Sequence, residues 1–123
     1  LDRADAVARY LYLKYGSPHQ EVMGALYLDS RSRLIALEEF FRGTINRTVV
    51  EPRALLRVGL TLGAAAMVLF HTHPSGDPAP SSEDLALTRR LDEAADVVGI
   101  RLVDHLIVGT ATRWISLRDR GWR

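Results

Sequence analysis

The chain has 123 residues and no cysteine, and its 16 Lys and Arg residues nearly balance its 15 Asp and Glu residues. This length corresponds to one domain, and an apolar fraction of 47% is sufficient to build a buried core. The lack of cysteine excludes disulfides, thiolate catalysis and metal sites with cysteine ligands. A net charge of +1 disfavours nonspecific electrostatic binding to nucleic acid. It does not exclude a local basic face, because 15 of the 16 basic residues are Arg.

Membrane insertion and export find no support in the sequence. The longest apolar run, residues 62–70, is far shorter than the roughly 20 residues that span a bilayer. The chain does not open with a charged segment followed by an apolar secretory leader. We therefore expect a cytoplasmic protein that has no membrane partner.

Hydrophobic periodicity and turn residues predict an alternation of helices and strands. Asp2 is the expected N-cap of the first helix, Pro52 suits the first turn of the second, and Gly99 is placed to end the third. In chain order, the predicted elements are a helix at 2–15, strands at 21–28 and 33–38 with an extension of the sheet at 43–47, a helix at 52–62, a strand at 65–70, a helix at 83–98, and strands at 100–108 and 112–117.

The order of these elements predicts the fold class. The run at 65–70 has no polar alternation, which is typical of an interior strand covered on both faces. Helices and strands alternate in the middle of the chain, whereas strands cluster toward both ends. We therefore expect an α/β (α+β) fold in which a mixed β-sheet is flanked by helices. In the helix at 83–98 the expected buried stripe consists of Leu87, Leu91, Ala94, Ala95 and Val98.

Metal-binding side chains gather just after the interior strand. Because side chains alternate along a strand, His71 and His73 are expected to point to the same side. Asp84 shares a helix face with Leu87 and Leu91, so its carboxylate is expected to point toward the core. Two imidazoles and one carboxylate supply three positions of a tetrahedral zinc site and leave the fourth for water. Zinc would make that water available as a nucleophile at neutral pH.

A simpler interpretation requires no metal. A His-x-His pair is by itself a weak signal. Ser81 and Asp84 also have the spacing of a helix capping box, with Ser81 as the N-cap and Asp84 at N3. The two interpretations are partly compatible, because the cap would fix the helix that presents the ligand.

The stretch from His71 to Asp84 resembles the JAMM motif of the JAB/MPN+ zinc metalloproteases. The RadC branch of this family usually has Asn where this chain has Thr72, but the wider family commonly has Ser or Thr there, so the metal site is not threatened. The resemblance implies a three-layer JAB/MPN architecture, which is cytidine-deaminase-like, over residues 16–123, with a helix at 1–15 packed on it. Phrases similar to the RadC branch occur at residues 26–29, 39–44, 52–53, 73–78 and 104–109.

The resemblance also implies roles for particular residues. His71, His73 and Asp84 would bind Zn²⁺, and Ser81 would donate a hydrogen bond to the oxyanion of a tetrahedral intermediate. These roles agree with the chemistry of the side chains.

A hydrolase of this kind also needs a general acid/base. The family uses a Glu at the start of an early strand, and the matching residue here is Glu21. Without the resemblance, Glu21 would be an ordinary solvated residue at a strand edge. Glu39 is the first alternative for the base, and Glu38 and Glu51 are the remaining candidates.

The function implied by the resemblance is that of a JAMM-type zinc metallopeptidase or isopeptidase acting on a peptide or protein substrate. Two alternatives stay open: a DNA-associated RadC module without peptidase activity, and a non-catalytic MPN scaffold. The near-neutral charge and the lack of a Gly-rich phosphate loop give nucleic-acid binding little support. RadC-like proteins often carry a helix-hairpin-helix region before this domain, and this chain has no room for one, which suggests a fragment or a short form.

Two further histidines lie outside the motif. His19 is in a predicted loop and is expected to be exposed. His105 follows Asp104 in an apolar strand. It could orient a metal ligand, but the favoured interpretation is an interior or edge histidine with satisfied hydrogen bonds.

Overall fold

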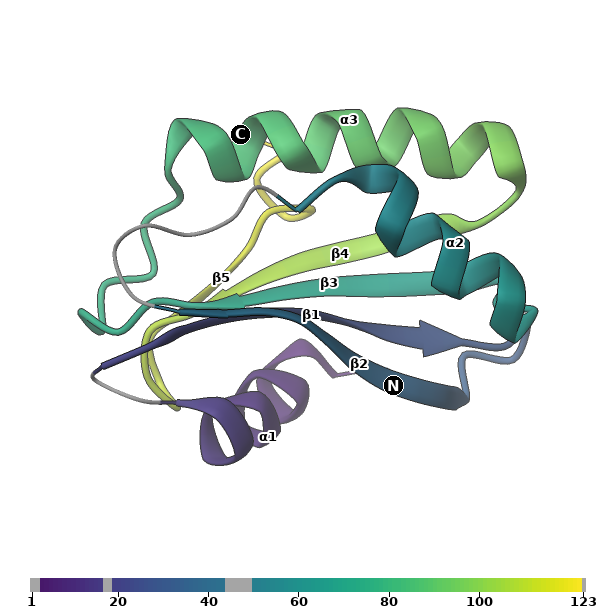
Figure 1. Ribbon diagram of the computed structural model, residues 1–123. Coiled ribbons are helices and arrows are strands. Elements are labelled where there is room, and N and C mark those ends of the chain that lie inside the picture. Colours follow the sequence, from purple (N-terminus) through teal and green to yellow (C-terminus); the bar gives the residue numbers. More distant parts are fainter. Residues whose placement is uncertain (1–2, 17–18, 44–49, 123) are drawn as a thin grey trace.

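The computed structural model describes residues 3–16, 19–43 and 50–122, which form one mixed sheet with helices on both faces (Figure 1). None of the described helices combines the length and apolarity needed to cross a membrane. In chain order, the elements are α1 (Ala4–Tyr15), β1 (Glu21–Leu28), β2 (Leu34–Gly43), α2 (Pro52–Leu62), β3 (Ala66–Thr72), α3 (Ser82–Val98), β4 (Arg101–Val108) and β5 (Trp114–Ser116).

The five described strands are arranged in the order β2-β1-β3-β4-β5. β1 is antiparallel to both of its neighbours, β3 is parallel to β4, and β4 is antiparallel to β5. In Figure 1, α1 lies on one face of this sheet, and α2 and α3 lie on the other. The predicted fold class, a mixed sheet flanked by helices in three layers, is therefore confirmed.

Two apolar clusters, one on each face of the sheet, form the core. Val68 and Phe70 pack in the cluster that contains α1, whereas Met67 and Leu69 pack in the cluster that contains α2 and α3. Every residue of β3 is buried, which confirms the interior strand expected from its unbroken apolar run. Because the side chains alternate, the end of β3 presents His71 on the same face as Leu69, toward α3.

The helix ends follow local chemistry. Pro52 occupies the first turn of α2, and Gly63, with φ 68°, ends the helix in the left-handed region. Gly99 ends α3 in the same way, with φ 81°. The predicted positions of Pro52 and Gly99 are confirmed. For α1 the predicted cap is wrong by one position: the N-cap is Arg3, whose guanidinium lies 2.7 Å from the carboxylate of Asp5, and Asp2 is outside the described residues.

Strand lengths differ from the prediction because pairing partners determine them. β2 continues beyond residue 38 to Gly43, since it pairs with β1 along its whole length, from Leu28 with Leu34 to Glu21 with Gly43. The predicted extension at 43–47 therefore begins with the last residue of β2, and residues 44–47 lie outside the described residues. β5 is shorter than predicted, because only its three residues pair with β4.

The buried stripe of α3 also differs from the expectation. It consists of Asp84, Thr88, Leu91 and Ala95, and Val98 is 41% exposed. The spacing of apolar residues alone places the stripe closer to Val98, because it leaves out the polar residues at the start of the helix. Two polar residues, Asp84 and Thr88, occupy the first two turns of the buried face instead. The polar start of this face is where the helix meets the end of β3.

Candidate metal centre

The candidate site lies where β1 begins, β3 ends and α3 begins. β1 and β3 are antiparallel with Met23 opposite His71, so the first residue of β1 lies beside the end of β3. The Thr72 hydroxyl accepts a hydrogen bond from the backbone N–H of Val22 at 2.9 Å. This buried hydrogen bond connects the start of β1 to the end of β3. Because Glu21 directly precedes Val22, the bond also keeps Glu21 close to His71.

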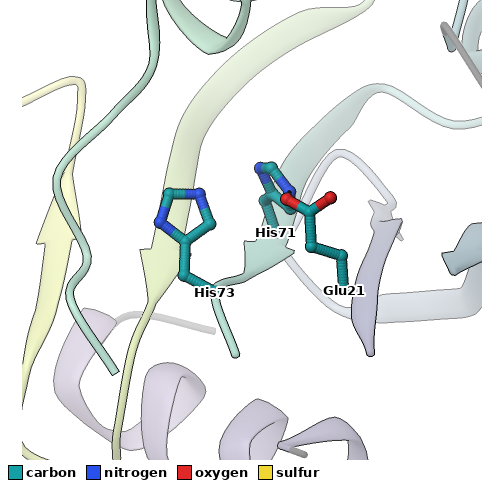
Figure 2. Close-up of side chains that lie close together, drawn as sticks. All are labelled: Glu21, His71 and His73. Atoms are coloured by element: carbon teal, nitrogen blue, oxygen red, sulfur yellow. Dashed lines mark hydrogen bonds and ion pairs between the residues drawn. The ribbon is translucent and has the colours of Figure 1, made fainter. Parts of the chain in front are cut away.

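Four side chains that the sequence singled out lie close together at this point: Glu21, His71, His73 and Asp84. His71 Nε2 is 2.7 Å from Glu21 Oε1, and Figure 2 shows this carboxylate directed at the ring. On the other side of the ring, His71 Nδ1 is 3.0 Å from Asp84 Oδ1. His73 Nε2 is 3.4 Å from Asp84 Oδ2, and the two imidazole rings meet edge to face at a centroid distance of 4.7 Å.

The donor set fits a metal ion. One ligand atom each from Glu21, His71 and His73 lie within 4.8 Å of one another. The carboxylate of Asp84, the predicted ligand, contacts both imidazoles from the helix side. Two carboxylates grouped with two imidazoles in a largely buried place favour a positive charge between them. Glu21 and Asp84 are thus both candidate carboxylate ligands. The ligand set of His71, His73 and Asp84 stays a prediction.

Hydrogen bonding at His73 leaves its inner nitrogen suited to a metal. His73 Nδ1 lies 2.9 Å from the backbone carbonyl oxygen of Asp77. A carbonyl only accepts, so Nδ1 carries the proton and Nε2, on the side of Asp84, carries the lone pair in the neutral ring. This is the common arrangement of a metal-binding histidine, in which the distal N–H is held by an oxygen acceptor.

The electrostatics of the cluster follow from the burial of its carboxylates and imidazoles. Burial lowers the pKa of His71, but the neighbouring carboxylates of Asp84 and Glu21 outweigh burial and raise it above the ordinary 6.5. Burial likewise raises the pKa of Asp84, yet His71 and His73 hold it far below the ordinary 3.8. The site therefore favours a positive charge beside the buried carboxylate of Asp84.

Ser81 and Asp84 form the predicted capping box. Asp84 N donates to Ser81 Oγ at 3.0 Å, and Ser81 N donates to Asp84 Oδ2 at 2.8 Å. The box fixes the first turn of α3 and orients the Asp84 carboxylate. Ser81 Oγ acts as the acceptor in this bond, so the bond does not use the hydroxyl proton. The proposed role of that hydroxyl at an oxyanion stays a prediction.

The alternative bases lie apart from the imidazoles. Glu39 lies on β2 and pairs with Arg42 at 2.7 Å. Glu51 precedes α2 and pairs with Arg90 at 3.1 Å. Glu38 is exposed on β2, where it is opposite Ala25. Among the four glutamates considered, the structure places Glu21 against an imidazole of the site.

The loop that carries His73 packs closely against the end of β4. His73 N donates to Val108 O at 2.9 Å, and Gly76 N donates to His73 O at 3.0 Å. A Cβ at Gly109 would meet the backbone oxygen of Gly76, and Gly76 itself has φ 84°. Only a glycine at position 109 lets the loop lie this close, which fixes His73 relative to β3.

Sequence reasoning did not identify Thr72 or Thr88 as part of the site. Thr88 lies one turn after Asp84 on α3, and its hydroxyl contacts both Asp84 O and His105 Nδ1. His105 is fully buried, but its Nε2 has no hydrogen-bond partner among the described residues, so the expectation of a satisfied histidine is wrong for one nitrogen. A polar residue at helical spacing from Asp84 was the available signal. His19 is exposed, as expected.

The sequence of the chain is similar to those of several known proteins. A family model described as RadC-like JAB domain matches residues 1–122. A UPF0758 protein of Xanthomonas campestris pv. campestris (strain 8004) is 46% identical over 122 residues, 99% of this chain and 54% of that protein. A UPF0758 protein of Stenotrophomonas maltophilia (strain K279a) is 49% identical over 116 residues, 94% of this chain and 49% of that protein. The chain thus spans about half the length of these two relatives. A UPF0758 protein of Vibrio cholerae is 41% identical over 120 residues, 98% of this chain and 75% of that protein.

Proposed function

Because the chain belongs to the family of RadC-like JAB domains, we propose that it is a zinc-dependent metallopeptidase or isopeptidase of the JAMM type. The observation that carries this proposal is the convergence of two imidazoles and two carboxylates, with His71 in contact with both Glu21 and Asp84. Imidazole and carboxylate ligands without cysteine suit a catalytic zinc ion. The substrate class is a peptide or protein whose amide bond is hydrolysed.

The proposed roles divide the cluster between binding and proton transfer. His71, His73 and Asp84 would hold the ion, which when bound polarises a carbonyl and lowers the pKa of water to about 7. Asp84 is suited to binding because it is buried, anionic and already in contact with both rings. The backbone oxygen of Asp77 supports His73 in this role by holding its Nδ1 proton.

Glu21 is the proposed general acid/base. Its side chain is 16% exposed, so its carboxylate borders both the imidazoles and solvent. From that position it would take a proton from the attacking water and deliver it to the leaving amine. Ser81, at the start of α3 beside Asp84, would donate its hydroxyl proton to the developing oxyanion.

Hydrolysis by the metal-loaded chain tests this function. We expect new amino termini, or released lysine amines, when the zinc-loaded protein is incubated with a mixture of peptides and lysine-linked isopeptides. The same protein treated with a chelator should give none, and added Zn²⁺ should restore the products. Mass spectrometry of the mixture measures both arms. Cleavage that continues after metal removal, or a zinc-loaded protein that cleaves no amide, would contradict the proposal.

A further inference from the structure

A histidine that the proposed chemistry does not use lies directly behind the metal centre. His105 is on β4 opposite Leu69 of β3, so its ring points to the face of the sheet that α3 covers. The residue is fully buried, and its Nδ1 is 2.6 Å from the hydroxyl oxygen of Thr88. Its ring lies nearly parallel to that of His71, with a centroid distance of 6.5 Å and an interplanar angle of 22°. In Figure 1, β4 runs beside β3 beneath α3.

The hydrogen bonds of Thr88 assign the proton of His105. Thr88 Oγ1 is 2.7 Å from the backbone oxygen of Asp84, which can only accept, so the Thr88 hydroxyl donates its one proton there. The same oxygen therefore accepts from His105, and His105 Nδ1 carries the proton. The other ring nitrogen of His105, Nε2, then carries a lone pair that accepts no hydrogen bond from the described residues. Burial lowers the pKa of His105 to about 3, which agrees with a neutral ring.

These bonds form a buried chain that ends at the first turn of α3. His105 donates to Thr88, Thr88 donates to the carbonyl of Asp84, and the carboxylate of Asp84 contacts His71 and His73. The capping box with Ser81 holds the same turn from the opposite end. A shift of this turn would change the distances from Asp84 to both imidazoles together.

Stability alone does not explain a histidine at this position. The neighbouring β4 residues Leu106 and Ile107 are apolar and buried, and a leucine would fill the space without leaving an unpartnered nitrogen. A buried polar atom without a partner destabilises a fold relative to an apolar side chain of similar shape. Unlike leucine, His105 can donate a hydrogen bond to Thr88, which in turn donates to the backbone oxygen of Asp84.

We propose that His105 is a positioning residue of the metal centre, which acts through Thr88 to hold Asp84 against His71 and His73. This inference rests on the proposed function in treating Asp84 as a ligand of the ion. His105 itself does not touch the ion or the reacting atoms. Its contribution is to fix the position and orientation of the first turn of α3 relative to β3.

Matched substitutions of Thr88 test the chain of bonds. Thr88→Val keeps the shape of the side chain and removes the hydroxyl, whereas Thr88→Ser keeps the hydroxyl. The control is Thr61→Val on α2, because Thr61 makes the same kind of bond to the carbonyl four residues earlier, at 2.9 Å from Arg57 O, on an exposed face. His105→Leu removes the donor and His105→Asn retains an N–H that can donate to Thr88.

The readouts are zinc affinity, by competition with a chromogenic chelator, and the visible spectrum of the Co²⁺-loaded protein, which reports ligand geometry. We expect Thr88→Val and His105→Leu to weaken zinc binding by about 10- to 100-fold and to alter the cobalt spectrum. Thr88→Ser, His105→Asn and Thr61→Val should remain close to the unsubstituted protein. A uniform loss of stability would not produce this division between conservative and disruptive variants.

The outcomes separate this inference from the proposed function. Folded Thr88→Val protein with unchanged zinc affinity and an unchanged cobalt spectrum would overturn the role of His105 alone. If His105→Leu does not fold, the comparison of Thr88→Val with Thr88→Ser decides the question. If the unsubstituted protein binds no metal, the proposed function fails, and this inference fails with it.

Discussion

Glu21→Gln is expected to lower the rate of amide hydrolysis by about 10²- to 10⁴-fold while the metal stays bound. The amide has the shape of the carboxylate and can still contact His71, 2.7 Å from Glu21 in the structure, but it cannot accept and return a proton. Turnover of a cleaved peptide gives the rate, and metal analysis of the same sample gives the occupancy.

Glu39→Gln is the matched control, because Glu39 pairs with Arg42 on β2 and does not reach the imidazoles in the described structure. It should retain full turnover. Unchanged turnover in Glu21→Gln would remove Glu21 from the mechanism. Loss of metal in Glu21→Gln would instead place Glu21 among the ligands, in the set with His71 and His73 whose donor atoms lie within 4.8 Å.

Asp84→Ala is expected to produce the second large effect, because this carboxylate caps the helix and is also the proposed ligand of the ion. Zinc affinity should fall by at least about tenfold, as a ligand in contact with both imidazoles is lost. The metal-free protein should also lose about 1–3 kcal/mol of unfolding free energy, because Ser81 N loses its acceptor in the capping box and the buried ring of His71 loses its carboxylate partner. Chelator competition and urea unfolding measure the two effects separately.

Asp92→Ala provides the comparison for Asp84→Ala, since Asp92 lies on the same helix and has no hydrogen-bond or ion-pair partner among the described residues. Its zinc affinity and unfolding free energy should stay near those of the unsubstituted protein. The dual role of Asp84 would be refuted by an Asp84→Ala protein that binds zinc with undiminished affinity.

Local rules were sufficient to place the imidazoles and the helix carboxylate. Strand alternation put His71 at the end of β3 on the face toward α3, with His73 in the loop that follows directly. Helical spacing turned Asp84 inward, where it is 1% exposed. Both rules act within a few residues, so they can be applied to a sequence. The capping box of Ser81 is local in the same sense.

Long-range pairing determined what the sequence did not reveal. The length of β2 depends on β1, which lies in a different part of the chain and is fully paired with it. The contact of Thr88 with His105 joins positions 17 residues apart, and that of Thr72 with Val22 joins positions 50 residues apart. Composition does not distinguish such buried threonines from exposed ones, because the partner appears only when the strands and α3 are packed.

The amount of zinc bound per chain tests directly whether the cluster at the start of β1, the end of β3 and the start of α3 holds one divalent cation. Native mass spectrometry should find one zinc ion in the unsubstituted protein and in His19→Ala, because His19 is an exposed histidine outside the cluster. His71→Ala should bind none. An unsubstituted protein without zinc, or a His71→Ala protein that retains it, would show that this cluster is not a metal centre.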